Sequence, residues 1–254
     1  MEYIRLGKTN LLISRVAFGA MRLNDSSAKE EDAALIVRKA YDAGINFFDT
    51  SRRTPESEKL LGDALYDIRQ NVILSTASNS KTYSEIEADL ETSLMTLHCD
   101  TLDLYQIETE VFLPLIGGQD KIYDTLLKAK KDNKIRHIGI VTTNFDTAKK
   151  AVLSDLYETI QFPFSMLSSE ETIELVKLCE EHDVGFIAMQ PLGGGVIDNI
   201  PLAFGFLQQF ESVIPIWGLQ SMEQIDQILY FNEHPPVIDE KFKEDVEKIR
   251  MFFN

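Results

Sequence analysis

The feature that most constrains the fold is an alternation, repeated eight times from about residue 15 onward, between short apolar runs and amphipathic segments. The apolar runs are continuous, as in parallel strands that are covered on both faces. The amphipathic segments place apolar residues at helical spacing, as Leu35, Ile36 and Ala40 do before Gly44. Eight strand-helix units in 254 residues predict one closed (β/α)8 TIM barrel, an α/β fold of about 250 residues. The apolar runs are RVAFGAMR, INFFDT, NVILSTAS, LDLYQIE, IRHIGIVTT, TIQFPFSML, GFIAMQPLGGG and SVIPIWG.

Two segments lie outside these units. Residues 2–14 form two extended runs around a Gly-Lys-Thr-Asn turn, which predicts an N-terminal β-hairpin closing the bottom of the barrel. The tail, which ends in Met251, Phe252 and Phe253, predicts a C-terminal helix packed across the barrel, with a contact to a second subunit as the alternative. We interpret residues 1–254 as a single barrel domain. A doubly wound sheet is disfavoured because no Gly-x-Gly-x-x-Gly turn follows the first strand.

Composition excludes several classes of function. Lys and Arg number 25 against 41 Asp and Glu, and the formal charge of −16 disfavours binding to nucleic acid and to anionic membranes. The start of the sequence lacks the basic and apolar pattern of a signal peptide, and no apolar run is long enough to span a bilayer, so we expect a cytoplasmic protein. Cys99 and Cys179 form no Cys-x-x-Cys pair and the histidines are scattered. We therefore predict no disulfide and no metal site.

In (β/α)8 barrels the chemistry takes place at the carboxyl ends of the strands. At one of these ends Asp49 directly follows Phe47 and Phe48, and the polar residues 50–53 come next. A carboxylate there, surrounded by hydrogen-bonding groups, is typical of an active site rather than of a structural turn. The strand ends to inspect are Met21, Asp49, Thr76, Ala77, Glu108, Thr142, Ser165, Gln190 and Gly218.

Five motifs, taken in their order and spacing, resemble the aldo-keto reductase family over nearly the whole chain. They are IRLGKTNLLISRVAFGAMRL, GINFFDTS, DLYQI, IRHIGI and PLGGG. The resemblance implies a barrel that binds a nicotinamide cofactor across its C-terminal mouth and transfers hydride to a carbonyl. It also implies a catalytic tetrad: an aspartate ending the second barrel strand, a tyrosine five residues later, a lysine ending the third strand and a histidine ending the fourth. The tyrosine protonates the nascent alkoxide, the ammonium lowers the pKa of that tyrosine, the aspartate fixes the ammonium, and the histidine orients the carbonyl.

Three of the four tetrad positions carry other residues in this chain. Asp49 matches the aspartate, but Thr54, Ala77 and Glu108 stand where the tyrosine, lysine and histidine would be. A threonine hydroxyl is too weak an acid to replace a tuned phenol, and alanine carries no charge. We therefore predict that ordinary NAD(P)H-dependent carbonyl reduction is lost and that the chain is a pseudoenzyme for that reaction, serving as a binding, regulatory or repurposed barrel.

The alternative is an active NAD(P)-linked oxidoreductase with an altered mechanism that uses Glu108 and Asp49. A glutamate with a raised pKa can act as a general acid. Glu108 can instead pair with Arg52 or Arg53, or simply be solvated. Asp49 can likewise be a structural remnant that holds the turn after it.

The resemblance also places cofactor contacts, and most of them are substituted. The Ser-Asn pair that holds the nicotinamide carboxamide aligns with Val141 and Thr142, whereas the glutamine remains as Gln161. At the positions where the family binds the adenosine phosphate, this chain has no cation. We therefore expect the binding of NADP or NAD to be weakened or absent, and the binding of NADPH to be weakened in particular. The positions that the resemblance assigns to phosphate binding are Gln220, Ser221, Gln224, Gln227 and Ile228. The candidate cofactor-binding residues are Thr142, Gln161, Ser165, Gly193 and Ser221.

Three smaller features bear on ligand binding. The glycine run that includes Gly193 can approach a pyrophosphate closely or be an ordinary loop. A helix N-terminus near Ser221 can attract an anion. Trp217, at the mouth end of the eighth strand, can stack on a ligand or plug the pocket. We expect a small molecule at the C-terminal mouth, and a protein partner or a homo-oligomer remains open.

Overall fold

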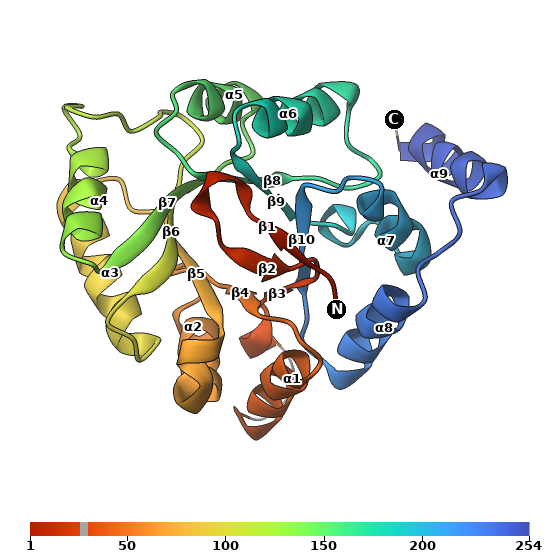
Figure 1. Cartoon of the computed structure of the whole chain (residues 1–254), viewed down its shortest axis with the longest axis horizontal. Helices are drawn as coiled ribbons and strands as arrows, with labels where there is room; N and C mark the ends of the chain where they lie inside the picture. The colour runs from red at the N-terminus through yellow and green to blue at the C-terminus, as the bar shows by residue number, and fades with distance from the viewer. Residues whose placement is uncertain (26–29, 254) are drawn as a thin grey trace.

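The computed structural model describes residues 1–25 and 30–253, and within these residues eight parallel strands close into a barrel (Figure 1). The predicted (β/α)8 fold is therefore confirmed. In order around the barrel, the strands are β10 (Val213–Gly218), β3 (Ala17–Gly19), β4 (Phe47–Asp49), β5 (Ile73–Ser78), β6 (Leu102–Glu108), β7 (Ile135–Val141), β8 (Thr159–Pro163) and β9 (Gly185–Met189).

Helices surround the barrel and bury their apolar faces against the strands (Figure 1). Local sequence signals start them: before the third helix, Thr82 accepts a hydrogen bond from Glu85 N while the Glu85 carboxylate accepts one from Thr82 N, a capping box. The helices are α1 (Glu30–Asp42), α2 (Pro55–Leu65), α3 (Tyr83–Thr96), α4 (Ile122–Lys131), α5 (Phe145–Leu153), α6 (Glu170–Glu181), α7 (Ile200–Gln208), α8 (Met222–Glu233) and α9 (Glu240–Phe253). Short 3-10 turns are η1 (Gly7–Thr9), η2 (Leu23–Asp25), η3 (Tyr66–Asn71) and η4 (Gly193–Gly195).

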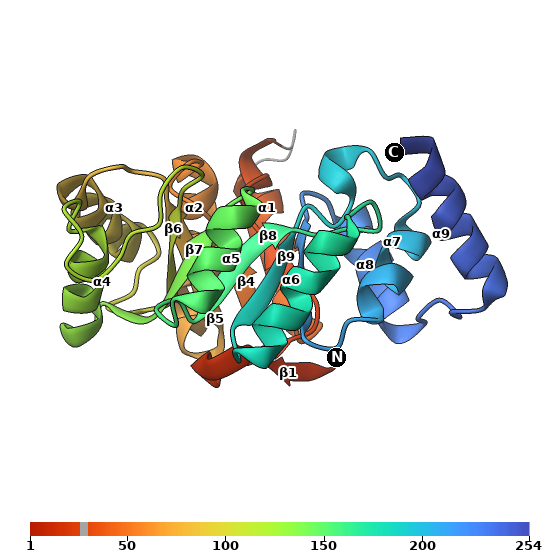
Figure 2. The same ribbon diagram turned by 90° about the horizontal axis from the view of Figure 1, so that it is seen from above.

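The N-terminal hairpin closes one end of the barrel, as predicted. Strands β1 (Tyr3–Arg5) and β2 (Leu12–Ser14) pair antiparallel, and Figure 2 shows them against the end of the barrel. Leu6 and Ile13 are buried in a cluster with Phe47 and Leu104 from the barrel interior. Because this apolar layer fills the bottom of the barrel, the barrel interior opens at the opposite end, where the strands terminate.

The end of the C-terminal helix differs from the prediction. Phe242 and Val246 near the start of α9 are buried, but Met251 and Phe252 are each 82% exposed and Phe253 is also exposed. The prediction that the terminal apolar residues pack on the barrel was therefore wrong. The helix is anchored by its buried first turns and by Arg250, which donates to the carbonyl oxygens of residues 166 and 168, so its last turn extends past the surface that would cover it.

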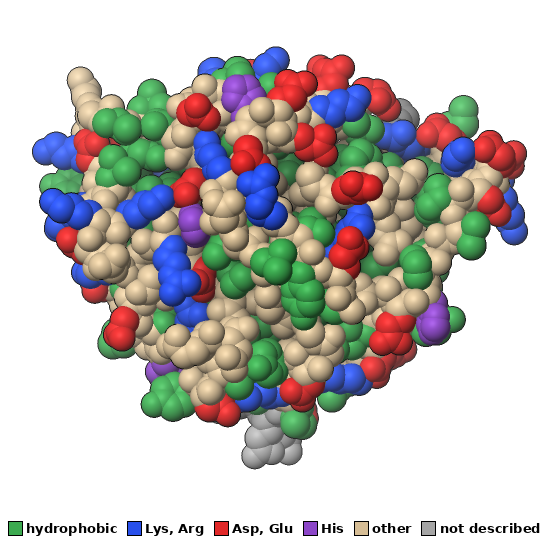
Figure 3. All heavy atoms as spheres, viewed as in Figure 1, with side chains coloured by type: hydrophobic (Ala, Val, Ile, Leu, Met, Phe, Trp, Pro, Cys, Tyr) green, Lys and Arg blue, Asp and Glu red, His purple; other side chains and the backbone are tan. Residues whose placement is uncertain are grey.

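The surface carries both signs of charge. Figure 3 shows carboxylates and cations interspersed on the face that bears the hairpin, so the net charge does not come from one acidic patch on that face. Within residues 1–25 and 30–253, no helix has the length and apolar character needed to cross a bilayer.

Close backbone packing of α2 on the end of α3 depends on Gly62. A Cβ atom at this position would lie 2.2 Å from the Thr96 carbonyl oxygen and 2.9 Å from Leu97 Cα. We expect Gly62→Ala to lower the free energy of unfolding by about 1–3 kcal/mol, because backbone atoms cannot move aside as a flexible side chain can. Urea denaturation measures this loss.

Gly218→Ala is the matched control, since the nearest atom to an added Cβ there is Arg22 Cδ at 3.9 Å. We expect it to change stability by less than about 0.5 kcal/mol. Equal stability changes in the two variants would contradict the proposed packing of α2 on α3.

Candidate functional site

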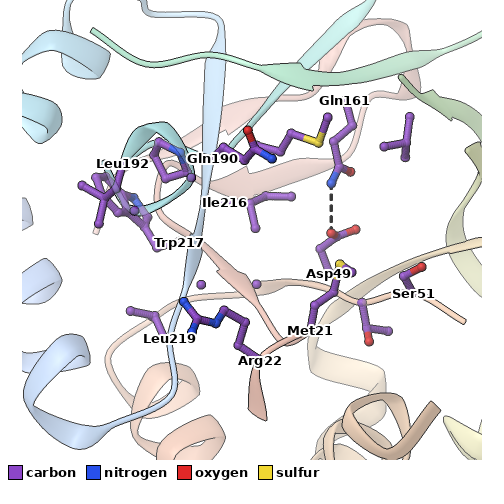
Figure 4. Close-up of a pocket in the computed structure, with 18 of the residues that line it drawn as sticks. Met21, Arg22, Asp49, Ser51, Gln161, Gln190, Leu192, Ile216, Trp217 and Leu219 are labelled. Atoms are coloured by element: carbon purple, nitrogen blue, oxygen red, sulfur yellow. Dashed lines mark hydrogen bonds between the residues drawn. The ribbon is translucent and has the colours of Figure 1, made fainter. Parts of the chain in front are cut away.

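A cavity of about 440 Å³ lies at the C-terminal ends of the barrel strands. Its volume is that of a pocket for a drug-sized molecule, about 300–1,000 Å³. All eight barrel strands contribute to the wall, which Figure 4 shows in part. The strand residues in the wall are Gly19, Asp49, Ala77, Glu108, Val141, Gln161, Met189, Ile216, Trp217 and Gly218.

Asp49, the last residue of β4, lies in this wall with only 3% of its surface exposed. The Gln161 side-chain amide donates to Asp49 Oδ2 at 3.2 Å (Figure 4). Within the described part of the chain, Oδ1 has no hydrogen-bond partner. Burial raises the pKa of Asp49 to about 7, although hydrogen bonds from Ser75 and Gln161 oppose the rise. This carboxyl group therefore titrates near neutral pH.

A chain of buried polar side chains crosses the barrel behind Asp49. Gln106 Nε2 donates to Gln161 Oε1 at 2.6 Å and to Ser75 Oγ at 3.1 Å. Both ends of the Gln161 amide are thus engaged, its oxygen by Gln106 and its nitrogen by Asp49. This chain fixes the orientation of Gln161, the residue that the resemblance assigns to the nicotinamide carboxamide.

Glu108, at the end of β6, is paired rather than free. Arg53 Nη1 lies 2.6 Å from Glu108 Oε1, and the Arg53 side chain is half exposed. Lys81 Nζ also donates to the Glu108 carbonyl oxygen at 3.3 Å. Of the two arginines considered from the sequence, Arg53 is the one that pairs with Glu108.

Arg52 points elsewhere, into a buried cluster that sequence reasoning did not identify. Its guanidinium lies 2.5 Å from the fully buried Glu58 of α2. The other oxygen of Glu58 accepts hydrogen bonds from Thr76 and Ser93, each at 2.8 Å. A signal was present, because Glu58 precedes Leu61 and Leu65 at helical spacing on the apolar face of α2.

Three of the four tetrad positions lie in the cavity wall, and the fourth lies in the turn before α2. Ala77 and Glu108 line the cavity with Asp49. Thr54 is instead the N-cap residue of α2, with its hydroxyl 3.4 Å from the Ser51 carbonyl oxygen, and among the described residues it is not part of the wall.

Of the candidate cofactor-binding residues, the described wall includes Gln161 but not the other four. The Thr142 hydroxyl donates to Glu110 at 3.1 Å. Ser165 Oγ and Ser221 Oγ accept from the backbone amides of residues 167 and 224, both at 3.2 Å. The neighbours of Gly193, residues 194 and 195, do line the cavity. These polar groups are therefore mostly used within the protein.

Sequence reasoning also missed Arg22, which lines the cavity together with Glu110. Arg22 lies next to Gly218 and Leu219 (Figure 4). Its guanidinium therefore lies near the residues that follow β10, where the sequence positions assigned to the adenosine phosphate carry no cation. The signal was its position one residue after Met21, an expected strand end.

Trp217 forms part of the cavity wall and of the core. Its ring stacks on Phe204 with centroids 5.7 Å apart and an interplanar angle of 20°, and only 2% of the residue is exposed. The indole is thus packed on Phe204 and forms part of the wall of an open cavity, which differs from both the ligand-stacking and the plugging roles considered from the sequence.

The described residues form no cluster of three or more His, Cys, Asp or Glu that could hold a metal ion.

The fold and the cavity together define a (β/α)8 barrel with a ligand-sized site at its C-terminal mouth. Residues 15–201 match the model of the aldo/keto reductase family. The chain therefore belongs to the aldo/keto reductase family, as its motifs predicted.

Individual relatives agree with this assignment. The chain is 27% identical over 227 residues to the probable aldo-keto reductase 1 of Glycine max, and 29% identical over 223 residues to the uncharacterized oxidoreductase YqkF of Bacillus subtilis. These alignments cover 79% and 80% of this chain but 64% and 68% of the relatives. The chain thus spans only about two thirds of their length.

Solved structures match over almost the whole chain. The aldo-keto reductase AKR11C1 from Bacillus halodurans, in its holo form, gives a TM-score of 0.84 at 21% identity and covers 98% of this chain and 96% of that protein. An aldo-keto reductase from Klebsiella pneumoniae in complex with NADPH gives 0.84 at 18% identity and covers 98% and 95%. At these identities the similarity establishes the fold.

Proposed function

We propose that this chain is a small-molecule-binding member of its family that has lost ordinary NAD(P)H-dependent carbonyl reduction. One observation carries the proposal: among the described residues of the cavity wall there is no tyrosine, lysine or histidine. Reduction of a carbonyl requires a proton donor at the oxygen as hydride arrives. The resemblance places the tyrosine, lysine and histidine of the tetrad at three positions of this chain. These positions are occupied by Thr54 at the N-cap position of α2, by Ala77 with its methyl group, and by Glu108 in its ion pair.

The residues that the resemblance assigns to the nicotinamide carboxamide, Gln161 and Thr142, do not fit a nicotinamide cofactor. Gln161 uses its amide nitrogen on Asp49 and its oxygen on Gln106, and the Thr142 hydroxyl is bonded to Glu110. A carboxamide entering here would have to break these buried or partly buried hydrogen bonds, each worth about 1 kcal/mol net. Since the Klebsiella pneumoniae relative binds NADPH, that nucleotide is the first to test, and we expect NADP and NAD to bind weakly or not at all.

The mouth is nevertheless built to accept a compact molecule. Its volume is adequate, and apolar side chains make up much of its wall. The apolar wall residues include Met21, Met189, Leu192, Ile200, Ile216, Leu219 and Ile228. Small-molecule binding at this mouth is therefore the activity that we propose was retained.

A second candidate is an oxidoreductase that uses Asp49 with Glu108. It is favoured by the same buried carboxyl group, because an acid with a pKa of about 7 can hold and release a proton near neutral pH. Against it stands the Arg53 ion pair, in which Arg53 Nη1 lies 2.6 Å from Glu108 Oε1 and so engages the carboxyl group that this mechanism would need at the substrate.

The two candidates predict different results with NADPH and NADH. We expect neither nucleotide to bind with a Kd below about 100 μM, and we expect no oxidation of either in the presence of aldehydes or quinones. Trp217 fluorescence reports binding, because this single tryptophan lines the cavity. Steady turnover that disappears in Glu108→Ala would overturn the proposal and establish the oxidoreductase.

A further inference from the structure

We propose that the cavity selects a compact apolar molecule bearing a protonated amine, and that Asp49 is the residue that recognises the amine. This inference rests on the proposed function, small-molecule binding at the mouth, and names the class of ligand for that site.

The protein leaves the buried Asp49 carboxyl group only partly hydrogen-bonded. This carboxyl group is almost completely buried, lines the cavity, and accepts a hydrogen bond from Gln161 on Oδ2, while the nearby Ser75 hydroxyl also lowers its pKa. Within residues 1–25 and 30–253, neither a salt bridge nor a hydrogen bond reaches Oδ1. A buried carboxylate that lacks a partner is unfavourable by several kcal/mol, and a donor placed at the open oxygen recovers part of that loss.

The neighbouring strand β5 supplies no cation to Asp49. Asp49 pairs with Ser75 in the register of β4 and β5, and Ala77 follows two residues later on the same face of β5. Ala77 also lines the cavity, where it presents only a methyl group. Space beside Asp49 is thus left for a cationic group that belongs to a ligand.

The other charged side chains of the described cavity wall are bonded or directed elsewhere. Glu108 is paired with Arg53 at 2.6 Å, and Glu110 accepts hydrogen bonds from residues 142 and 143. Arg22 points toward Trp217 and Leu219 rather than toward Asp49 (Figure 4). Among the wall residues that the structure describes, Asp49 is therefore the carboxylate whose Oδ1 is left for a ligand.

Charge and shape together define the ligand class. The apolar wall requires an apolar body, and the single open carboxylate oxygen requires a donor at one end. A cationic donor makes a stronger bond to a carboxylate than a neutral one. The net charge of −16 further favours cations and disfavours anions in the mouth.

Three probes that share one naphthalene ring test this proposal: 1-naphthylmethylamine, 1-naphthylmethanol and 1-naphthoic acid. Calorimetric titration of the whole protein at about pH 8, where both the amine and Asp49 are charged, gives their affinities. We expect the amine to bind at least about tenfold tighter than the alcohol, and the acid to bind most weakly.

Two variants tie the preference to Asp49. Asp49→Asn is expected to bring the amine and the alcohol within about threefold of each other. Ala77→Lys places an ammonium next to Asp49 and is expected to weaken amine binding by about tenfold. Asp155→Asn, an exposed carboxylate paired with Lys8 of η1, removes the same charge away from the cavity and should preserve the preference.

The proposal is overturned if the acid binds as tightly as the amine, if Asp49→Asn keeps the amine preference, or if none of the three probes binds. Equal binding of all three would refute the amine preference while leaving the proposed small-molecule binding intact. Turnover of NADPH would refute the proposed loss of reductase activity while leaving the charge preference as measured.

Discussion

Asp49→Asn is expected to stabilise the folded protein at about pH 8 and to remove a component of its pH dependence between about pH 4 and pH 7. Burial is the main cause: it raises the pKa of Asp49 from its ordinary value of 3.8 to about 7. The folded state thus favours a neutral side chain at this position. Asparagine is neutral and retains an oxygen that can accept the hydrogen bond from Gln161.

The direction of this pH dependence follows from the number of protons that Asp49 binds in the folded and unfolded states. Between about pH 4 and pH 7 the folded protein keeps the Asp49 proton and the unfolded chain releases it, so stability falls as pH rises through this range. A shift of about three pKa units corresponds to at most about 4 kcal/mol, lost by pH 8. Asparagine avoids this loss at every pH.

Urea unfolding of both proteins at about pH 5 and pH 8 measures the effect. Glu158, whose pKa is lowered to about 2, acts in the opposite sense below about pH 4.5 and is common to both proteins, so it cancels in the comparison. Asp155→Asn controls for the change in net charge. If Asp49→Asn is less stable than the unsubstituted protein at pH 8, the Asp49 carboxylate has a stabilising partner, and this account of its pKa is wrong.

The barrel was predictable because its signal is repeated along the chain. Each of eight apolar runs became a strand, and the hairpin signal around Gly7 was local enough to be read directly. The location of Asp49 followed as well, since a residue that ends a strand must lie at the C-terminal mouth. The apolar pattern wrongly predicted that Met251 and Phe252 pack on the barrel, because an apolar side chain is buried only where another part of the protein covers it.

The contacts of the site could not be predicted, because they join residues far apart in sequence. Gln161 meets Asp49 across 112 positions and Gln106 across 55, and no local pattern encodes either contact. Adjacent residues also diverge: Arg52 and Arg53 look equivalent in sequence, yet one reaches into the core beside α2 and the other across the mouth. Only the direction of each side chain decides which carboxylate it pairs with.

Removing Arg52 should therefore cost far more stability than removing Arg53. In Arg52→Ala the fully buried Glu58 loses its cation and keeps only the hydroxyl groups of Thr76 and Ser93, so we expect a loss of about 3–5 kcal/mol in the free energy of unfolding. Arg53→Ala breaks an ion pair with a half-exposed arginine and should lose less than about 1 kcal/mol. Urea denaturation at neutral pH measures both.

A double substitution separates the unpaired charge from lost packing. If the penalty in Arg52→Ala comes from a buried, uncompensated carboxylate, then making Glu58 neutral with Glu58→Gln in the same chain should restore part of the stability. The glutamine oxygen can still accept from Thr76 and Ser93. A double variant that is less stable than Arg52→Ala would show that packing of the Arg52 side chain, rather than charge, holds α2 against β5 and α3.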